Sequence, residues 1–316
     1  MSDDTANVAI IGAGDIGRGW AALFVAAGWK VSLYDNDSSL LESAQPEIER
    51  RAKTLVMLKH ADAESAERGF NQLHMGRSLL DGCRDANWII EAIAEDTKAK
   101  QKLVEGLESA APEAEVVSSS ATAMSVHDMV ARAQRPERCL VVHPMNPPEL
   151  IPLVEMVQGE GTDPAVVEKT RTWLRQVGRI PVLLKKPVLG NIVTRISAAV
   201  WREAIDLVIN GVIDVDDFDR AVSLGPALGW AAAGPHLSHN LAAGNQPVAG
   251  FFQHLLHTYQ DIWEDLADWS HLDPQQEHTL IHKVDAAYKD NLPAIRDARD
   301  RRLAGILQGM DRARNR

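Results

Sequence analysis

Short apolar runs, each bounded by glycine or polar residues, recur along the first part of the chain, and segments with helical spacing separate them. A short apolar run of this kind is typical of a buried parallel strand, whereas apolar residues at every third or fourth position indicate a helix. We predict strands at 8–11, 30–34, 87–93, 139–143, 153–157 and 180–184, and one more that starts at 116. The alternation predicts an α/β fold with a doubly wound, mostly parallel sheet.

The pattern changes beyond Lys185-Lys186-Pro187, where the strand signal fades and the chain becomes helical. Helices are predicted at about 192–209, 247–269, 274–290 and 293–312, and Asp214 is placed to cap a short helix. We therefore predict two domains: a sheet domain over residues 1–187 and an all-α domain over 188–316. Within the first domain, the polar residues 61–82 are predicted to form only a helix and a turn.

The first predicted strand runs into Gly12-x-Gly14-x-x-Gly17, a helix follows, and the next strand ends on Asp35. In a Rossmann-type unit the first glycine permits a tight turn, the second lets the backbone approach a pyrophosphate, and the third lets the helix pack on the strand. Asp35 is placed to bind the adenosine ribose, and because no arginine follows it, NAD is favoured over NADP. The alternative is an ordinary glycine turn, which the strand–helix context disfavours. The residues assigned to this cofactor site are Gly12, Gly14, Asp15, Ile16, Gly17 and Asp35.

A second informative stretch is CLVVHPMNPPELIPLVEMV, residues 139–157. Its four prolines lie between two predicted strands, and since proline cannot donate to a ladder, the chain must reverse outside the sheet. That reversal can bring His143 beside Glu155. A neutral imidazole can take a hydroxyl proton while a carboxylate on its other nitrogen fixes the tautomer. A strand-end histidine with an unrelated surface glutamate explains the spacing equally well.

Polar residues follow other predicted strands at the edge where ligands bind in such sheets. Glu91 lies near the end of the strand at 87–93, Glu95 and Lys100 come after it, and the run SSSAT (118–122) ends the strand that starts at 116. The helix predicted at 38–60 carries basic residues along one face, which either meet an anion such as the phosphates of coenzyme A or face solvent: Arg50, Arg51, Lys53 and Lys59.

Composition narrows the range of partners. The 316 residues carry a net charge of −11 and no long basic run, which argues against nucleic acid and anionic membranes. The two cysteines, Cys83 and Cys139, suggest neither a disulfide framework nor a metal site. The first residues, MSDDTAN, are polar, and no apolar run approaches the ~20 residues that span a bilayer. We expect a cytoplasmic protein without a bound metal.

Taken in order, these motifs resemble the 3-hydroxyacyl-CoA dehydrogenase superfamily over nearly the whole chain, and most closely its lambda-crystallin and L-carnitine dehydrogenase branch. The segments that carry the resemblance are VAIIGAGDIGRGWAALF, EAIAEDTKAK, SSSATAM, HPMNPPELIPLVE, GNIVTRI and GPALGWAAAGP. The resemblance implies a Rossmann domain followed by a helical domain that carries a homodimer interface.

The resemblance also implies roles for individual residues. His143 matches the catalytic base of the family, Glu155 its carboxylate partner, and Thr122 the position of a serine that contacts the substrate hydroxyl. Asn146 matches an asparagine near the nicotinamide. Other positions that match the family's cofactor site are Glu95, Lys100 and Ser120.

Two segments depart from the family pattern. GNIVTRI places Thr194 where the family has a catalytic asparagine and Asn191 where it has a phenylalanine, so both stay candidates for positioning the substrate. Gly229 precedes Trp230 where relatives often carry an arginine. These changes affect the expected substrate and leave the expected reaction unchanged.

The sequence therefore predicts an NAD-dependent dehydrogenase that oxidises the secondary alcohol of a small 3-hydroxy acid or related compound, with His143 as general base. One alternative is a 3-hydroxyacyl-CoA dehydrogenase, which the basic helix face would support. The other is a non-catalytic, crystallin-like NAD-binding protein, against which the His143–Glu155 pair argues.

Overall fold

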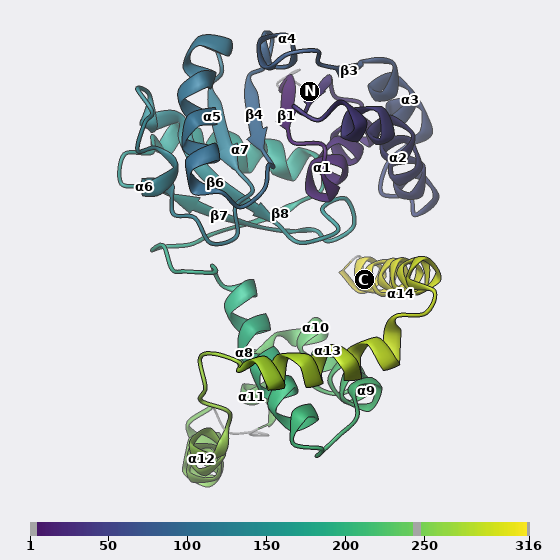
Figure 1. Cartoon of the computed structure of the whole chain (residues 1–316), viewed down its shortest axis with the longest axis vertical. Coiled ribbons are helices and arrows are strands. Elements are labelled where there is room, and N and C mark those ends of the chain that lie inside the picture. Colours follow the sequence, from purple (N-terminus) through teal and green to yellow (C-terminus); the bar gives the residue numbers. More distant parts are fainter. Residues whose placement is uncertain (1–4, 243–247, 315–316) are drawn as a thin grey trace. The chain divides into compact units, whose positions relative to one another are not determined.

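The computed structural model describes residues 5–242 and 248–314, so the first four residues, including most of the polar start MSDDTAN, lie outside the described part. The chain forms two compact units, Met1–Arg195 and Ile196–Arg316, which are described separately below as the first and the second unit. Figure 1 shows the sheet and its helices in the first unit and the helices of the second.

The first unit is built on an eight-stranded sheet in the order β3-β2-β1-β4-β5-β6-β7-β8. All neighbouring strands are parallel except β6 and β7, which are antiparallel. The strand order reverses between β1 and β4, which is where doubly wound sheets bind ligands. The strands are β1 (Val8–Ile11), β2 (Val31–Tyr34), β3 (Leu73–Met75), β4 (Trp88–Glu91), β5 (Val116–Ser119), β6 (Cys139–Pro144), β7 (Leu153–Gln158) and β8 (Ile180–Leu183).

Helices lie on both faces of this sheet, as the predicted βαβ alternation requires (Figure 1). They are α1 (Asp15–Ala26), α2 (Ser38–Met57), α3 (Ala63–Asn71), α4 (Leu79–Cys83), α5 (Thr97–Ala110), α6 (Val126–Met129) and α7 (Pro164–Gln176). Every residue of β1 and β4 is buried, so their sequences are continuously apolar up to the polar Glu91. Between sheet and helices, buried aromatic rings pack on one another: Trp20, Phe24, Trp88 and Trp173.

The segment 61–82 differs from its prediction. It forms α3, the three-residue strand β3 and the short helix α4, where only a helix and a turn were expected. β3 pairs with β2 at the edge of the sheet, and its side chains are only partly buried or exposed. A strand so short and so little buried has no apolar run to reveal it in the sequence.

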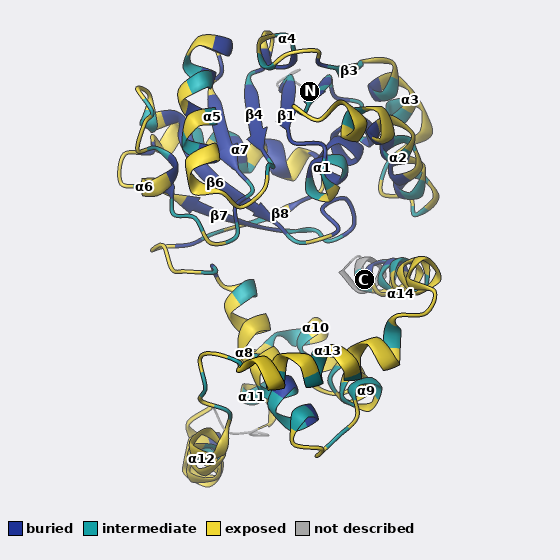
Figure 2. Ribbon diagram, in the orientation of Figure 1, coloured by how far each residue is buried: buried dark blue, intermediate teal, exposed yellow. Residues whose placement is uncertain are grey.

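The second unit is helical in its described residues, which agrees with the fold predicted for this part of the chain. It holds α9 (Val215–Leu224), α10 (Pro226–Ala233), α11 (Pro235–Ala242), α12 (Val248–Asp265), α13 (Pro274–Tyr288) and α14 (Leu292–Arg314), and α8 (Val193–Ile209) leads into it from the first unit. Figure 2 shows these helices mostly exposed, whereas the central strands of the first unit, such as β1, β4, β5 and β6, are buried.

Large apolar side chains are exposed on nearly every helix of the second unit. The side chains of Trp201, Leu224 and Trp263 are 64%, 73% and 57% exposed. Trp269, in contrast, is partly buried, and its Nε1 donates a hydrogen bond to Oδ1 of Asp206 at 3.0 Å. Apolar surface on this scale is unusual for an isolated domain.

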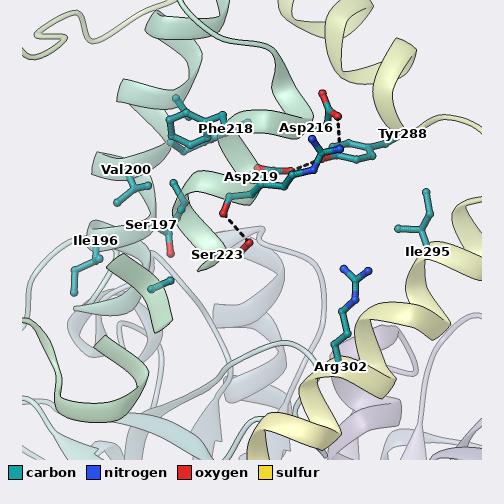
Figure 3. Close-up of a pocket in the computed structure, with 15 residues that line it drawn as sticks. Ile196, Ser197, Val200, Asp216, Phe218, Asp219, Ser223, Tyr288, Ile295 and Arg302 are labelled. Carbon is teal, nitrogen blue, oxygen red and sulfur yellow. Dashed lines mark hydrogen bonds and ion pairs between the residues drawn. The ribbon is translucent and has the colours of Figure 1, made fainter. Parts of the chain in front are cut away.

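A large open cavity of about 890 Å³ lies within the second unit (Figure 3). Apolar side chains of α8 and α9, including Val200 and Phe218, form much of its wall. The Tyr288 hydroxyl donates to Oδ2 of Asp219 at 2.6 Å, which raises the pKa of that phenol to about 12. The cavity is lined by none of the residues that the sequence assigned to catalysis or cofactor binding.

Both cysteines are free thiols and are buried in the first unit. Burial raises the pKa of each, Cys83 and Cys139, to about 12. No helix in the described part of the chain is both long and apolar enough to cross a membrane.

Candidate active site

The glycine turn after β1 has the geometry of a phosphate-binding loop. Gly12 has a positive φ of 112°, and a Cβ there would lie 2.4 Å from the carbonyl oxygen of Ala92. A Cβ on Gly17 would lie 1.8 Å from the carbonyl oxygen of Gly12, so α1 can approach the turn only without one. Gly14 differs, because a Cβ there would meet nothing within 4 Å. The backbone is thus open to a ligand at Gly14.

Helix α1 begins directly after Gly14, and no side chain caps it. The first N–H groups of a helix have no acceptor within the helix, and the positive end of the helix dipole favours an anion beside them. Asp15 and Ile16 supply two of these backbone N–H groups. The turn and the helix start therefore fit the pyrophosphate of NAD.

Asp35 follows β2 and faces this turn. Its Oδ2 accepts a hydrogen bond from the backbone N–H of Ala13 at 2.7 Å, and its Oδ1 accepts one from Asp37 at 2.9 Å. These bonds hold the carboxylate beside the glycine turn at the carboxyl end of the strand. The position fits an acceptor for the ribose hydroxyls of NAD.

His143 and Glu155 lie directly opposite each other on the antiparallel strands β6 and β7. His143 Nδ1 lies 3.0 Å from Glu155 Oε2, and the two residues are only 7% and 1% exposed. Because the carboxylate accepts a hydrogen bond from Nδ1–H, the neutral imidazole keeps its lone pair on Nε2. Thr122 Oγ1 lies 3.2 Å from this Nε2. The geometry thus brings a base, its orienting carboxylate and a hydroxyl together, which the spacing alone left open.

The second carboxylate oxygen of Glu155, Oε1, also accepts hydrogen bonds. Oε1 accepts hydrogen bonds from the backbone N–H groups of Ile192, at 2.8 Å, and Val193, at 3.0 Å. These two amides lie at the start of α8. The carboxylate is therefore fixed on both sides, which in turn fixes the orientation of the imidazole.

Two residues of the segment GNIVTR differ in their placement. Asn191 is buried, has a positive φ of 51°, and donates from Nδ2 to the carbonyl oxygen of Thr122 at 3.5 Å. Thr194 is half-buried at the start of α8, and its hydroxyl makes no hydrogen bond with any described residue. Asn191 therefore belongs to the group around His143, whereas no hydrogen bond among the described residues links the Thr194 side chain to it.

Glu95 contacts the group around His143 directly, through Thr122, whereas Lys100 binds the end of β4. Oε1 of Glu95 accepts from the backbone N–H of Thr122 at 2.6 Å, so Glu95 holds the loop that carries the hydroxyl. The Lys100 ammonium is buried and donates to Glu91 Oε1 at 2.7 Å and to the carbonyl oxygen of Ile93 at 3.1 Å. Lys100 thus stabilises the end of β4, and its Nζ lies 3.7 Å from Oε2 of Glu95.

The remaining predicted cofactor residues lie on two loops. The Ser120 hydroxyl, just after β5, accepts a hydrogen bond from Nε1 of Trp20 at 3.1 Å. Asn146 is exposed after β6 and precedes a cis peptide bond to Pro147. The polar atoms of its side chain make no hydrogen bond within the described residues.

Sequence reasoning overlooked a buried polar network beside these loops. The guanidinium of Arg179 donates to the carbonyl oxygens of Pro148, Glu149 and Ile151, at 3.0–3.3 Å, and so holds the loop that follows His143. Burial lowers the pKa of Arg179 to about 10, against the opposing effect of the Glu149 charge. Its position after Gly178 gives no signal of such a role in the sequence.

The basic helix face is resolved by the structure into ion pairs. Arg50 and Arg51 both bind Glu47, and Lys53 binds Glu49. Arg51 is buried. Three of the four basic residues are therefore occupied by carboxylates of the same chain, and they give little support to a site for coenzyme A.

A cavity of about 240 Å³ opens beside Thr122 and Asn191 within the first unit. Polar and apolar side chains both line it, with Met124 and Val157 among the apolar ones, and Asp128 is the one charged residue among the described residues of its wall. A small group without negative charge fits such a cavity better than a phosphate or a carboxylate.

Comparison with known proteins gives matches over nearly the whole chain. Residues 7–187 match the family model for the 3-hydroxyacyl-CoA dehydrogenase NAD-binding domain, and residues 190–283 match the model for its C-terminal domain. An L-carnitine dehydrogenase from Streptomyces coelicolor is 32% identical over 311 residues, which cover 98% of this chain and 96% of that protein. The human lambda-crystallin homolog is 32% identical over 235 residues, 72% of each chain.

Among solved structures, the fold is similar to that of 5-formyl-3-hydroxy-2-methylpyridine 4-carboxylic acid 5-dehydrogenase, described as an NAD⁺-dependent dismutase. The TM-score is 0.84 with 26% identity, and the match covers 97% of this chain and 99% of that one.

Proposed function

Because the chain belongs to the 3-hydroxyacyl-CoA dehydrogenase family, we propose that its His143, Glu155 and Thr122 carry out the alcohol oxidation of an NAD-dependent dehydrogenase. The protein is an NAD-dependent oxidoreductase that converts the secondary alcohol of a small 3-hydroxy compound to the ketone, reversibly. The observation that carries the assignment of residues is the placement of His143 between the carboxylate of Glu155 and the hydroxyl of Thr122.

When bound, NAD supplies the hydride acceptor for the carbinol carbon. The protein's own residues then transfer the proton of the substrate hydroxyl. Nε2 of His143 takes the proton of the substrate hydroxyl, and Glu155 stabilises the imidazolium that forms. Thr122 donates a hydrogen bond to the substrate oxygen, with Asn191 and Glu95 holding the Thr122 backbone. In the reverse direction the imidazolium returns the proton to the ketone oxygen.

The substrate we favour is a small 3-hydroxy acid rather than a coenzyme A thioester. Two relatives named L-carnitine dehydrogenase are matched over 98% of this chain, and carnitine is a 3-hydroxy acid with a cationic end. The paired basic residues of α2 leave little positive charge for coenzyme A, and in the small cavity beside Thr122 the acidic Asp128 suits the cationic end of such a substrate and not its carboxylate. A role without turnover would leave the buried His143–Glu155 pair without a purpose.

The test is NADH production across three matched sets of compounds: small 3-hydroxy acids including L-carnitine, their coenzyme A esters, and neutral secondary alcohols. We expect the highest kcat/KM among the small 3-hydroxy acids. A preference for the coenzyme A esters would favour the alternative, a 3-hydroxyacyl-CoA dehydrogenase. No turnover of any of them, by an enzyme that still binds NADH, would favour a binding protein.

We also propose that the protein is a homodimer, with residues 1–187 as NAD-binding domain and 188–316 as the domain that carries the interface. The exposed apolar side chains of the second unit support this, since a partner would remove them from water. The free, buried cysteines and the use of NAD fit a cytoplasmic enzyme. The net charge of −11 argues against nucleic acid as a partner.

A further inference from the structure

A buried guanidinium lies beside the first residue of the phosphate-binding helix. Arg51 of α2 has a side chain that is 10% exposed, and its Nη2 forms an ion pair with Oδ1 of Asp15. Nη1 also lies 3.3 Å from the carbonyl oxygen of Asp15. Arg51 thus reaches from one helix to the N-terminus of another.

Two more carboxylates hold this guanidinium in place. Nε of Arg51 donates to Glu47 Oε1 at 2.8 Å, and Nη1 lies 3.4 Å from Oε1 of Glu149. Burial by itself lowers the pKa of Arg51, but Glu149, Asp15 and Glu47 together raise it above its ordinary value. The guanidinium is therefore charged at every physiological pH, and its contacts leave it little freedom to turn elsewhere.

Glu149 links Arg51 to the loop that follows His143. The loop packs tightly on α1, since a Cβ on Gly19 would lie 2.7 Å from both Glu149 Oε2 and Pro148 Cδ. Glu149 is buried, so its charge must be paired to be tolerated. The loop, the helix start and α2 thus share one ion cluster.

Asp15 is an unfavourable residue for its position on electrostatic grounds. It occupies the first turn of α1, where the backbone N–H groups receive the diphosphate, and its side chain is 55% exposed. A carboxylate there satisfies the helix dipole in the absence of ligand but repels a second anion. Some other group must offset its charge for the dinucleotide to bind well.

We propose that Arg51 is a positioning residue for the cofactor, which holds the carboxylate of Asp15 toward α2 and neutralises it so that the diphosphate of NAD can occupy the start of α1. The proposal rests on the use of NAD in the proposed function. It does not depend on which alcohol is oxidised or on the role of His143.

The test measures binding of ADP-ribose and of adenosine by calorimetry, and of NADH by fluorescence. ADP-ribose carries the diphosphate and adenosine does not. Arg51→Met should weaken ADP-ribose and NADH about tenfold, roughly 1.4 kcal/mol, and leave adenosine unchanged. Lys53→Met is the matched control, because Lys53 lies on the same helix and pairs only with the exposed Glu49 in the described contacts. It should bind all three ligands as the wild type does.

Asp15→Asn shows whether the Asp15 carboxylate weakens or strengthens the binding of the diphosphate. In the Arg51→Met background it should restore most of the lost affinity for ADP-ribose, because the repelling charge is gone. By itself it should bind ADP-ribose as tightly as the wild type or a few-fold more tightly, since its backbone N–H is retained. This single variant removes an exposed charge, so it tests the proposal even if Arg51→Met fails to fold. The Arg51→Met comparison is then repeated with Glu149→Gln, which removes the buried carboxylate left without its partner.

Three results would overturn the proposal: unchanged affinity for ADP-ribose in Arg51→Met, no recovery in the double variant, or a tenfold loss in Asp15→Asn alone. The last would mean that the Asp15 carboxylate itself binds the cofactor. A failure of the proposed function would look different, because ADP-ribose would still bind while no hydroxy acid was oxidised.

Discussion

His143 can act as a base only while Nε2 carries its lone pair. Glu155 stabilises that tautomer because its carboxylate accepts a hydrogen bond from Nδ1–H. The backbone amides of Ile192 and Val193 in turn set the orientation of the carboxylate. The residue types and spacing predicted the pair as one of two equal alternatives. What decided between them was the register of β6 on β7, which depends on contacts of both strands with the rest of the sheet and so cannot be read from the segment alone.

Substitution of His143 by alanine should lower kcat by ~10²–10⁴, the usual contribution of a positioned general base. NADH should still bind, because the glycine turn and Asp35 are untouched. A His143→Ala enzyme as fast as the wild type would show that the base lies elsewhere.

Glu155→Gln should also lower kcat strongly. The two amides at the start of α8 would bind the new carbonyl oxygen, so its NH₂ group would face Nδ1 of His143 and favour the tautomer with the proton on Nε2. We expect a loss of about 10²-fold or more in kcat with little change in the Kd of NADH. A kcat near that of the wild type would mean that Glu155 does not control the tautomer.

Asp35 should determine the choice of dinucleotide. Its carboxylate, held by Ala13 and Asp37, repels a 2′-phosphate, so NADH should bind at least about tenfold more tightly than NADPH, or 1.4 kcal/mol. Asp35→Ala should narrow that gap. Fluorescence titration of both dinucleotides measures it, and equal affinities in the wild type would place Asp35 away from the ribose.

At the scale of elements, the sequence predicted the strands that carry an apolar run, even the largely exposed β8, and missed β3, which has none. It also predicted the strand–turn–helix of the cofactor site, because glycine is the one residue that fits the positive φ of Gly12 and the close contact at Gly17. Lys100 shows the limit of such reasoning. Its position in the chain resembles that of a cofactor ligand, while its ammonium is buried against Glu91.

The glycines of the turn should therefore respond differently to alanine. Gly17→Ala places a methyl group against the Gly12 carbonyl, so it should lower Tm by several degrees and weaken NADH binding. In Gly14→Ala the methyl group points into open space, so Tm should hold while NADH binding falls. Thermal melts and fluorescence titration of both variants separate the two effects, and a large drop in Tm for Gly14→Ala would contradict this account.

For the whole molecule, the two units differ in how completely they bury their apolar residues. The first encloses its aromatic cluster around the sheet, whereas the second leaves Trp201, Leu224 and Trp263 largely in water. The sequence predicted both folds from their patterns. It could not reveal which apolar residues the second unit leaves uncovered, because a helical stripe looks the same whether its partner is the same chain or another.

We expect a homodimer at micromolar concentration, measured by light scattering coupled to gel filtration. Because burial of an exposed tryptophan and its neighbours drives such association, Trp201→Glu or Trp263→Glu should shift the protein toward monomer or aggregate. Substitution of an exposed polar residue, Gln253→Glu, is the control and should leave the dimer intact. A wild-type monomer would rule the dimer out.

The bond between Glu155 and the start of α8 bears on how enzymes of this kind can be recombined. Glu155, which we propose to orient the catalytic base, accepts hydrogen bonds from the amides of residues 192 and 193, so this linker would act together with the base although it precedes the second unit in the chain. A foreign helical domain joined after Pro187 would bring its own linker and leave Glu155 dependent on the donor's loop geometry. Joined after Arg195, the same domain would leave both hydrogen bonds of Glu155 intact, so the second unit is best exchanged at that junction.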